Sequence, residues 1–286
     1  LAFKPTCFIL KKNLKKASKK TYDKLIKIKK IVGDFNPDII ISDMETFSSY
    51  IASEKKIPLI SIDNQHYLLY GKYTFPEKYR LSYLKALMIV KSIMFKADYY
   101  LTMCFSGCKI QDKSHLFPIQ PILREEIMKA KPKRLDYVFV YQSTKSYDKL
   151  IDILKRINYK FVIYGFDKDK KVDNLVFKKF DDGKKFVDDL VNCKAVITNG
   201  GFTLISEALY LNKPILVVPI KKHFEQILNA LYVKENKFGE FYGDLNENHV
   251  VEFIINLKKY RFDKIHKWNN DHTFRLLDML IRKETK

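Results

Sequence analysis

The 286-residue sequence predicts an α/β fold made of two doubly wound domains, each with a parallel sheet. From residue 38 onward, short apolar runs alternate with longer segments of helical periodicity, which is typical of strands and helices in a parallel sheet. The alternation is interrupted by residues 117–134, which lack strong periodicity, contain three prolines and end in a basic cluster. Because the pattern restarts after this interruption, we expect the two halves to share one architecture.

The first half opens with a basic segment and continues with strands and helices. Residues 1–36 carry eleven lysines against two aspartates, and apolar residues recur at helical spacing within residues 14–32. This pattern predicts a basic amphipathic helix, and such helices pack on their own domain more often than on a bilayer. We predict strands at residues 38–42, 57–62 and 98–103, and helices at residues 45–55 and 81–95.

The second half contains a complete set of alternating elements. We predict strands at residues 136–141, 160–164, 175–180, 195–198 and 214–218, and helices at residues 147–157, 184–193, 203–211, 223–237, 247–259 and 265–282. The chain is therefore divided into a first domain at residues 1–125, a linker at 126–135, a second domain at 136–262 and a C-terminal helix at 263–286. We expect this last helix to pack back on the first domain.

The composition limits the possible partners. With 53 basic and 33 acidic residues, the formal net charge is +20, which favours nucleic acid, an acidic membrane surface or a phosphorylated substrate. The alternative is that the lysines serve only to keep the protein soluble, since Lys-rich surfaces also occur in proteins without an anionic partner. A nucleic-acid-binding protein is an alternative that would explain the charge directly, but no recognition motif is present, so nucleic acid is not the expected partner. Four cysteines are few for this length, which indicates a reducing cytoplasm without disulfides, and no run of about 18 apolar residues could span a membrane.

Metal binding is not expected either. Cys104 and Cys108 form a pair, but no second pair completes a zinc site.

Ligands of open parallel sheets bind beyond the carboxyl ends of the strands. This rule selects four loops, at residues 42–45, 63–66, 142–144 and 198–203. The last loop is the most informative, because two glycines allow a tight turn between a strand and a helix whose first amides then point at one place. This geometry suits a diphosphate, and Glu207, one turn into the helix, suits the hydroxyls of a ribose. The alternative is a plain strand-to-helix turn with a solvated Glu207.

Three segments carry a resemblance to a known family. Residues 199–208 (NGGFTLISEA), residues 213–219 from Lys-Pro to Pro, and residues 225–230 (EQILNA) together resemble the C-terminal half of the GT-B nucleotide-sugar glycosyltransferases. The pattern is most similar to family 28, which includes the peptidoglycan lipid N-acetylglucosaminyltransferase and diacylglycerol sugar transferases, and to the related family 1. The resemblance implies two Rossmann-like domains and transfer of a sugar, from a UDP-sugar donor and with inversion, without a metal or other cofactor.

The resemblance also implies roles for individual residues. Main-chain groups of Gly200, Gly201, Phe202 and Thr203 would contact the donor diphosphate, with Asn199 beside them and Ser143 facing the phosphates from another loop. Glu207 would hold the ribose, and Glu225 and Gln226 would read the transferred sugar. The nucleobase of the donor would lie against residues 180–186, with Phe180 and Phe186 as the candidate contacts.

The first half matches the acceptor domain of these enzymes less fully. Residues 38–43 and 57–64 are similar to it, but the expected first strand and Gly-rich, histidine-bearing loop are missing from the sequence. We expect that this segment precedes Leu1 and was lost, in which case the chain would bind a donor yet transfer it poorly. Within the sequence, the candidate general bases are His66, Asp43 and Glu45, and histidine is favoured because it titrates near neutral pH. The alternative for His66 is a hydrogen-bonded structural role.

The acceptor is not defined by these motifs. The apolar segment 81–95 with its basic flanks would suit a membrane-facing patch and a lipid acceptor, although a helix buried on the sheet explains it as well. We therefore expect a cytoplasmic protein that can bind peripherally to the inner face of an anionic membrane. A nucleotide-sugar 2-epimerase of the same fold is the alternative enzyme, and an assay of free donor would separate the two.

Overall fold

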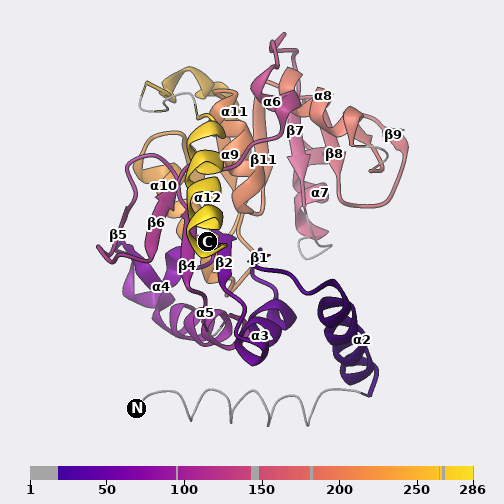
Figure 1. The fold of residues 1–286 in the computed structure, drawn as a ribbon. Helices are drawn as coiled ribbons and strands as arrows, with labels where there is room; N and C mark the ends of the chain where they lie inside the picture. Colours follow the sequence, from indigo (N-terminus) through magenta and orange to yellow (C-terminus); the bar gives the residue numbers. More distant parts are fainter. Residues whose placement is uncertain are drawn as a thin grey trace. The chain divides into compact units, whose positions relative to one another are not determined.

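The computed structural model describes residues 19–94, 96–142, 148–180, 183–263, 265 and 268–285 (Figure 1). The chain folds into two compact units. The first unit consists of Leu1–Tyr73, Leu84–Gln120 and Asp271–Lys286, and the second of Thr74–Tyr83 and Pro121–Asn270. Both units are α/β with parallel strands, so the predicted fold class is confirmed. None of the described helices combines the length and the apolar content that a bilayer-spanning segment needs.

The first unit has a four-stranded parallel sheet. Its strands lie in the order β1 (Ile40–Ser42), β2 (Leu59–Asp63), β4 (Tyr99–Met103) and β6 (Leu116–Ile119). The central strand β2 is buried along almost its whole length, as expected for a strand covered on both faces. Two short loop strands, β3 (Gly71–Lys72) and β5 (Lys109–Ile110), form a separate antiparallel ribbon.

In the described part of this unit, five helices belong to it wholly or in part. They are α2 (Lys19–Phe35), α3 (Thr46–Lys55), α4 (Tyr67–Tyr70), α5 (Arg80–Ile93) and α12 (Asp271–Glu284), with the short 3-10 turn η1 (Glu77–Tyr79) before α5. The terminal helix α12, yellow in Figure 1, joins the sheet of the first unit through Tyr99 of β4. The Tyr99 hydroxyl donates to Glu284 Oε1 at 2.6 Å and accepts from Lys283 Nζ at 2.9 Å.

The second unit has a seven-stranded sheet in the doubly wound order. From one edge to the other the strands are β13 (Gly239–Phe241), β12 (Ile215–Val217), β11 (Ala195–Thr198), β7 (Val138–Tyr141), β8 (Phe161–Tyr164), β10 (Leu175–Phe177) and β9 (Lys170–Val172). All pairs are parallel except the edge pair of β10 with β9. The chain starts at β7, adds β8 and β10 on one side, and then crosses back to add β11 on the other.

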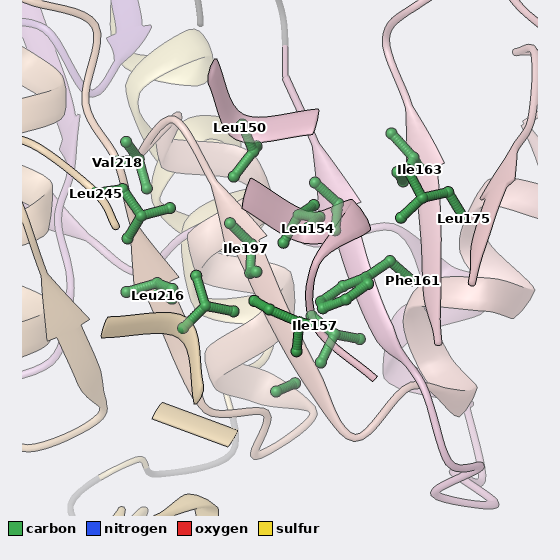
Figure 2. Close-up of a cluster of buried hydrophobic side chains, with 14 of the residues drawn as sticks. Leu150, Leu154, Ile157, Phe161, Ile163, Leu175, Ile197, Leu216, Val218 and Leu245 are labelled. Carbon is green, nitrogen blue, oxygen red and sulfur yellow. The ribbon is translucent and has the colours of Figure 1, made fainter. Parts of the chain in front are cut away.

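Helices cover both faces of this sheet. They are α6 (Glu125–Met128), α7 (Asp148–Lys155), α8 (Lys184–Asn192), α9 (Phe202–Tyr210), α10 (Phe224–Glu235) and α11 (Glu247–Ile255), with the 3-10 turn η2 (Leu257–Lys259). Side chains alternate between the faces along β7. Val138 and Val140 join the core shared with α7 and α11, of which Figure 2 labels Leu150 and Leu154 of α7. Phe139 instead contacts Phe186 of α8 at a 5.0 Å ring separation.

Three segments differ from the sequence-based expectation. Residues 116–119, at the start of the stretch without periodicity, form strand β6, and they can do so because β6 lies at the edge of its sheet, where Pro118 is tolerated. The terminal helix begins at Asp271 rather than at residue 265. Residues 126–135, interpreted as a linker, lie within the second unit, where Ile127 of α6 is fully buried.

Candidate active site

A pocket lies where the strand order of the second unit reverses. Strands β7 and β11 are neighbours in the sheet but leave it toward opposite sides, so their carboxyl ends open a crevice, the usual ligand position in doubly wound sheets. The cavity there measures about 400 Å³, within the range of small-molecule sites. It is lined by Arg124, Tyr141, Phe180, Gly183, Phe186, Thr198, Asn199, Gly201, Phe202, Thr203, Leu204 and Glu207. Seven of these residues are among the predicted donor-binding or base-binding ones.

The two glycines of the turn after β11 have different tasks. Gly200 has a φ of 99°, and a Cβ there would lie 2.9 Å from Val217 Cγ1 and 3.0 Å from the Gln226 carbonyl, so only glycine fits. Gly201 has an ordinary φ of −63° and begins α9 as its N-cap without a side chain to cap the helix. A Cβ on Gly201 would meet nothing within 4 Å, so the space beside the first turn of α9 is open on the pocket side.

The turn is held against α10 by amide side chains. Asn229 Nδ2 donates to the Gly200 carbonyl at 3.0 Å, and Gln226 Oε1 accepts from the backbone N–H of Ile220 at 2.9 Å. Gln226 is buried and Glu225 is half-buried, and neither lines the pocket. The structure therefore places Gln226 behind the glycine turn, with its side-chain oxygen already bound to the backbone.

The carboxylate of Glu207 is buried in the pocket and paired with an arginine. Arg124 Nε donates to Oε1 and Nη2 to Oε2, both at 2.7 Å, while the Glu207 side chain is 2% exposed and that of Arg124 40%. This charge-assisted bond raises the pKa of Arg124 further. The backbone before Arg124 is fixed by Asn270, whose side chain accepts from Leu123 N at 3.1 Å and donates to Leu123 O at 2.9 Å.

Sequence reasoning missed Arg124. It precedes the segment interpreted as a linker and is 83 residues from Glu207, so no local pattern points to it. A carboxylate has about four acceptor positions, and Arg124 takes two of them. Two positions therefore remain on Glu207 for hydroxyl donors from the pocket.

An aromatic wall forms another side of the pocket. Phe180 is 52% exposed and stacks on the buried Phe186, with a ring separation of 5.0 Å and an interplanar angle of 24°. Tyr141 meets both rings edge-on, and the Arg124 guanidinium lies 5.7 Å from the Phe186 ring centre. The exposed face of the Phe180 ring is thus available to a planar ligand, and the buried Phe186 ring packs on the opposite face of Phe180. Ser143, a predicted phosphate contact, lies outside the described residues.

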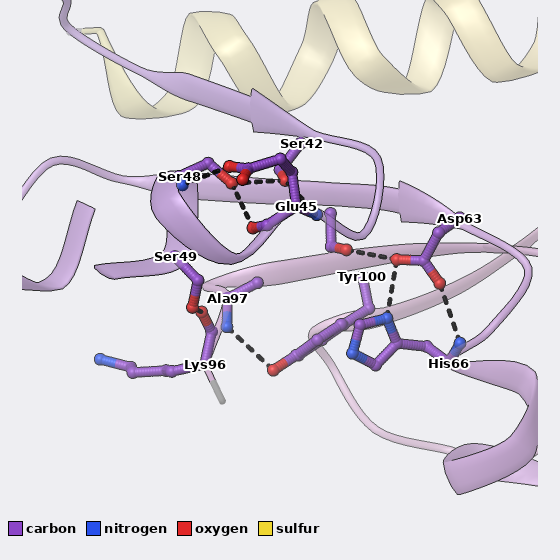
Figure 3. A network of polar contacts seen from close by, with 10 residues as sticks. Ser42, Glu45, Ser48, Ser49, Asp63, His66, Lys96, Ala97 and Tyr100 are labelled. Carbon is purple, nitrogen blue, oxygen red and sulfur yellow. Dashed lines mark hydrogen bonds and ion pairs between the residues drawn. The ribbon is translucent and has the colours of Figure 1, made fainter. Parts of the chain in front are cut away.

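In the first unit, His66 forms a buried pair with Asp63 at the carboxyl end of β2 (Figure 3). His66 Nδ1 lies 2.7 Å from Asp63 Oδ2, and the His66 backbone N–H donates to Oδ1 at 2.8 Å. Ser61 Oγ also donates to Asp63, at 2.5 Å. Both His66 and Asp63 are 1% exposed, and His66 Nε2 has no hydrogen-bond partner among the described residues. Asp63 lies in the loop 63–66 that the sequence analysis selected, but it was not among the candidate bases.

The two other candidate bases lie in the neighbouring loop after β1. Glu45 is the N-cap of α3, and its Oε2 accepts from Ser48 N at 2.8 Å, so it has a structural role (Figure 3). Asp43 is open to solvent overall, but the neighbouring atoms that cover part of its carboxyl group, and secondly the charge of Asp63, raise the pKa of that carboxyl. Among the described residues, no group of three or more His, Cys, Asp or Glu side chains is arranged to hold a metal ion.

Comparisons with known proteins identify similar folds. The family model described as glycosyl transferase family 1 matches residues 6–258. The solved glycotransferase of kitacinnamycin is 15% identical, with a TM-score of 0.61 over 92% of this chain and 79% of that chain. UGT2 of Phytolacca americana, solved with UDP-2fluoro-glucose and pterostilbene, is 13% identical, with a TM-score of 0.60 over 84% of this chain and 71% of that chain.

MurG of Acinetobacter baumannii is 12% identical, with a TM-score of 0.54 over 89% of this chain and 77% of that chain. No curated protein matches this sequence.

Proposed function

The chain belongs to glycosyl transferase family 1 and is a glycosyltransferase, and we propose that it transfers a sugar from a UDP-sugar to an acceptor hydroxyl with inversion of the anomeric centre. The observation that carries the proposal is the buried Glu207 carboxylate, in one pocket with the open first turn of α9 and the exposed ring of Phe180. A nucleoside diphosphate needs these three environments: a hydrogen-bond acceptor for ribose hydroxyls, amides for the diphosphate and a flat apolar surface for the base.

We assign the donor contacts as follows. Backbone amides at the start of α9, beside Gly201, bind the diphosphate, and the helix dipole adds favourable charge. Glu207 accepts the ribose hydroxyls while Arg124 keeps its carboxylate in place. Phe180 stacks on the nucleobase, and the neighbouring rings of Tyr141, Tyr164 and Phe186 hold it in position. The UDP-sugar analogue in the Phytolacca americana structure supports a donor whose base is uracil.

We assign the general base to His66. Asp63 Oδ2 accepts a hydrogen bond from the Nδ1–H of a neutral imidazole, which leaves the lone pair on Nε2 to accept a proton from the attacking hydroxyl. In the proposed step, the acceptor oxygen bonds to the anomeric carbon, its proton passes to Nε2, and UDP leaves with the electrons of the broken carbon–oxygen bond. The exposed Asp43 is the alternative base, whereas the capping role of Glu45 argues against Glu45.

We further propose that the acceptor is lipid-linked. Leu81, Leu84, Met88 and Ile89 of α5 are 66%, 46%, 64% and 57% exposed, and their spacing places them on one face of the helix. Lys85 and Lys91 are exposed on the same helix, and the chain as a whole is basic. An apolar helix face with lysines beside it fits the interface of an anionic bilayer, so we place the working protein at the cytoplasmic face of such a membrane.

A donor screen tests the proposed function. Binding of UDP-, GDP- and TDP-sugars to the native chain would be followed by the increase in melting temperature, since a ligand of the folded state stabilises it. UDP-sugars should give the largest increase, and incubation of the best donor with a lipid extract should release UDP. Stabilisation by none of the three donor classes would contradict the proposal.

A further inference from the structure

Ser61 is a polar residue inside the buried strand β2 of the first unit. It is 0% exposed, and the residues before it in the strand, Leu59 and Ile60, are apolar and buried as well. A buried hydroxyl lowers stability unless it has a hydrogen-bond partner. The partner of Ser61 is Asp63, because Ser61 Oγ donates to Asp63 Oδ2 at 2.5 Å. The two side chains can meet because residues two positions apart in a strand lie on the same face of the sheet.

The Asp63 carboxylate accepts hydrogen bonds on both of its oxygens. Ser61 Oγ and His66 Nδ1 meet Oδ2 at 2.5 and 2.7 Å, and the backbone N–H of His66 donates to Oδ1 at 2.8 Å. The carboxylate cannot rotate without losing at least one of these contacts. Ser61 therefore fixes the same oxygen that contacts the imidazole of His66.

Two tyrosine rings confine the imidazole of His66 but do not determine its direction. Tyr100 of β4 is the register partner of Ser61, so its side chain lies on the face that carries Ser61 and Asp63. The ring centres of Tyr100 and His66 are 4.6 Å apart (Figure 3), and Tyr70 stacks on His66 at 5.9 Å with an interplanar angle of 11°. Such contacts restrict the plane of the ring, whereas a hydrogen bond at one nitrogen determines which way both nitrogens face.

We propose that Ser61 is a positioning residue for the proposed general base: it holds Asp63 Oδ2 in place for His66 Nδ1 and so fixes the direction of the Nε2 lone pair. The inference rests on the proposed function, in which His66 accepts the proton of the attacking hydroxyl. Ser61 itself gives up no proton in the reaction and acts only through Asp63. Its loss should therefore slow the transfer step and leave donor binding unchanged.

Thr102 offers a matched control on the neighbouring strand. It is the register partner of Asp63 on β4, lies on the same face of the sheet and is 1% exposed. Its Oγ1, however, has no hydrogen-bond partner among the described residues. Thr102→Val thus removes a buried hydroxyl beside Asp63 without removing a contact to Asp63, whereas Ser61→Ala removes the contact. A general effect of losing a buried hydroxyl would appear in both variants, and an effect through Asp63 in Ser61→Ala alone.

Nuclear magnetic resonance of the full chain, with its histidines labelled with ¹⁵N, tests the positioning without any substrate. The His66→Gln variant identifies the ring signals of His66. We expect a resolved Nδ1–H resonance of His66 in the native chain, because that proton is buried and bound to Asp63. Ser61→Ala should move or broaden this resonance, whereas Thr102→Val should leave it unchanged.

Kinetics provide the second readout. Ser61→Ala should lower kcat by roughly tenfold, the kinetic equivalent of one hydrogen bond, with the KM of the donor unchanged. Ser61→Thr, which keeps the hydroxyl, should restore most of kcat, and Ser61→Cys, a weaker donor of similar volume, should behave like Ser61→Ala. Thr102→Val should keep the native kcat, and melting curves would show that each variant is folded.

Two results would overturn the role of Ser61. One is a native Nδ1–H resonance of His66 in folded Ser61→Ala or Ser61→Cys, and the other is a kcat of these variants equal to that of Thr102→Val. If the native chain transfers no sugar, the proposed function fails, and the resonance alone decides whether Ser61 positions the imidazole.

Discussion

Arg124 holds both carboxylate oxygens of Glu207 through two hydrogen bonds of 2.7 Å inside the pocket of the second unit. A carboxylate that is 2% exposed needs such a partner, because an unpaired buried charge is costly. The pair also limits the hydrogen bonds that Glu207 can accept from a ligand, because only the lone pairs that Arg124 does not use remain available.

Loss of the arginine should destabilise the fold. Arg124→Met leaves Glu207 buried without its partner, which should lower the free energy of unfolding by about 1–3 kcal/mol, below the cost for a fully buried pair because Arg124 is partly exposed. Urea denaturation would measure the change. Arg80→Met is the matched control, because Arg80 and Glu77 are 67% and 75% exposed and their pair should contribute less than about 1 kcal/mol. Equal effects of the two substitutions would refute the importance of the buried pair.

The two glycines of the turn should respond differently to alanine. Gly200→Ala forces a side chain into a left-handed conformation and against Val217 and Gln226, and should cost about 1–3 kcal/mol of stability. Gly201→Ala meets open space and should leave stability within about 0.5 kcal/mol, yet weaken UDP binding because the methyl group occupies the pocket side of α9. Calorimetric titration of UDP into both variants checks this. An unchanged UDP affinity of Gly201→Ala would contradict the assignment of the diphosphate to the first turn of α9.

Much of this site is predictable from local sequence, because a strand, two glycines and a helix follow one another within residues 195–210. The doubly wound order then places the turn at the crevice beside β7. Arg124 was not predictable, because its role depends on a contact between segments 83 residues apart. Strand β6 was missed for a related reason, since proline normally argues against a strand and only its edge position makes Pro118 acceptable.

The proposed base can be separated from donor binding. His66→Gln should lower kcat by roughly 10²–10⁴-fold while the dissociation constant of UDP stays the same, because His66 lies in the first unit and the proposed donor contacts lie in the second. Asp63→Asn should also lower kcat, since it removes the acceptor that orients the imidazole. If Asp43→Asn lowers kcat more than His66→Gln does, Asp43 is the base.

Membrane binding should depend on the exposed face of α5. The chain should co-sediment with anionic vesicles more than with neutral ones, and less at high salt, because the basic surface is screened. Replacement of both Leu84 and Met88 by glutamate should abolish the binding, whereas Ile255→Glu, at a position 74% exposed on α11, should not. Equal sedimentation with anionic and neutral vesicles would show that the positive charge does not direct the chain to membranes.

The central claim is that the pocket of the second unit binds a UDP-sugar through Glu207, and calorimetric titration of UDP-glucose into the native chain and the Glu207→Ala variant tests it most directly. We expect saturable one-to-one binding by the native chain. We expect the variant to bind about 1.5–3 kcal/mol more weakly, roughly a 10- to 150-fold higher dissociation constant, the range for hydrogen bonds to a charged group. Melting curves of both proteins would show that the variant is folded. Equal affinity of a folded variant and the native chain would contradict the claim.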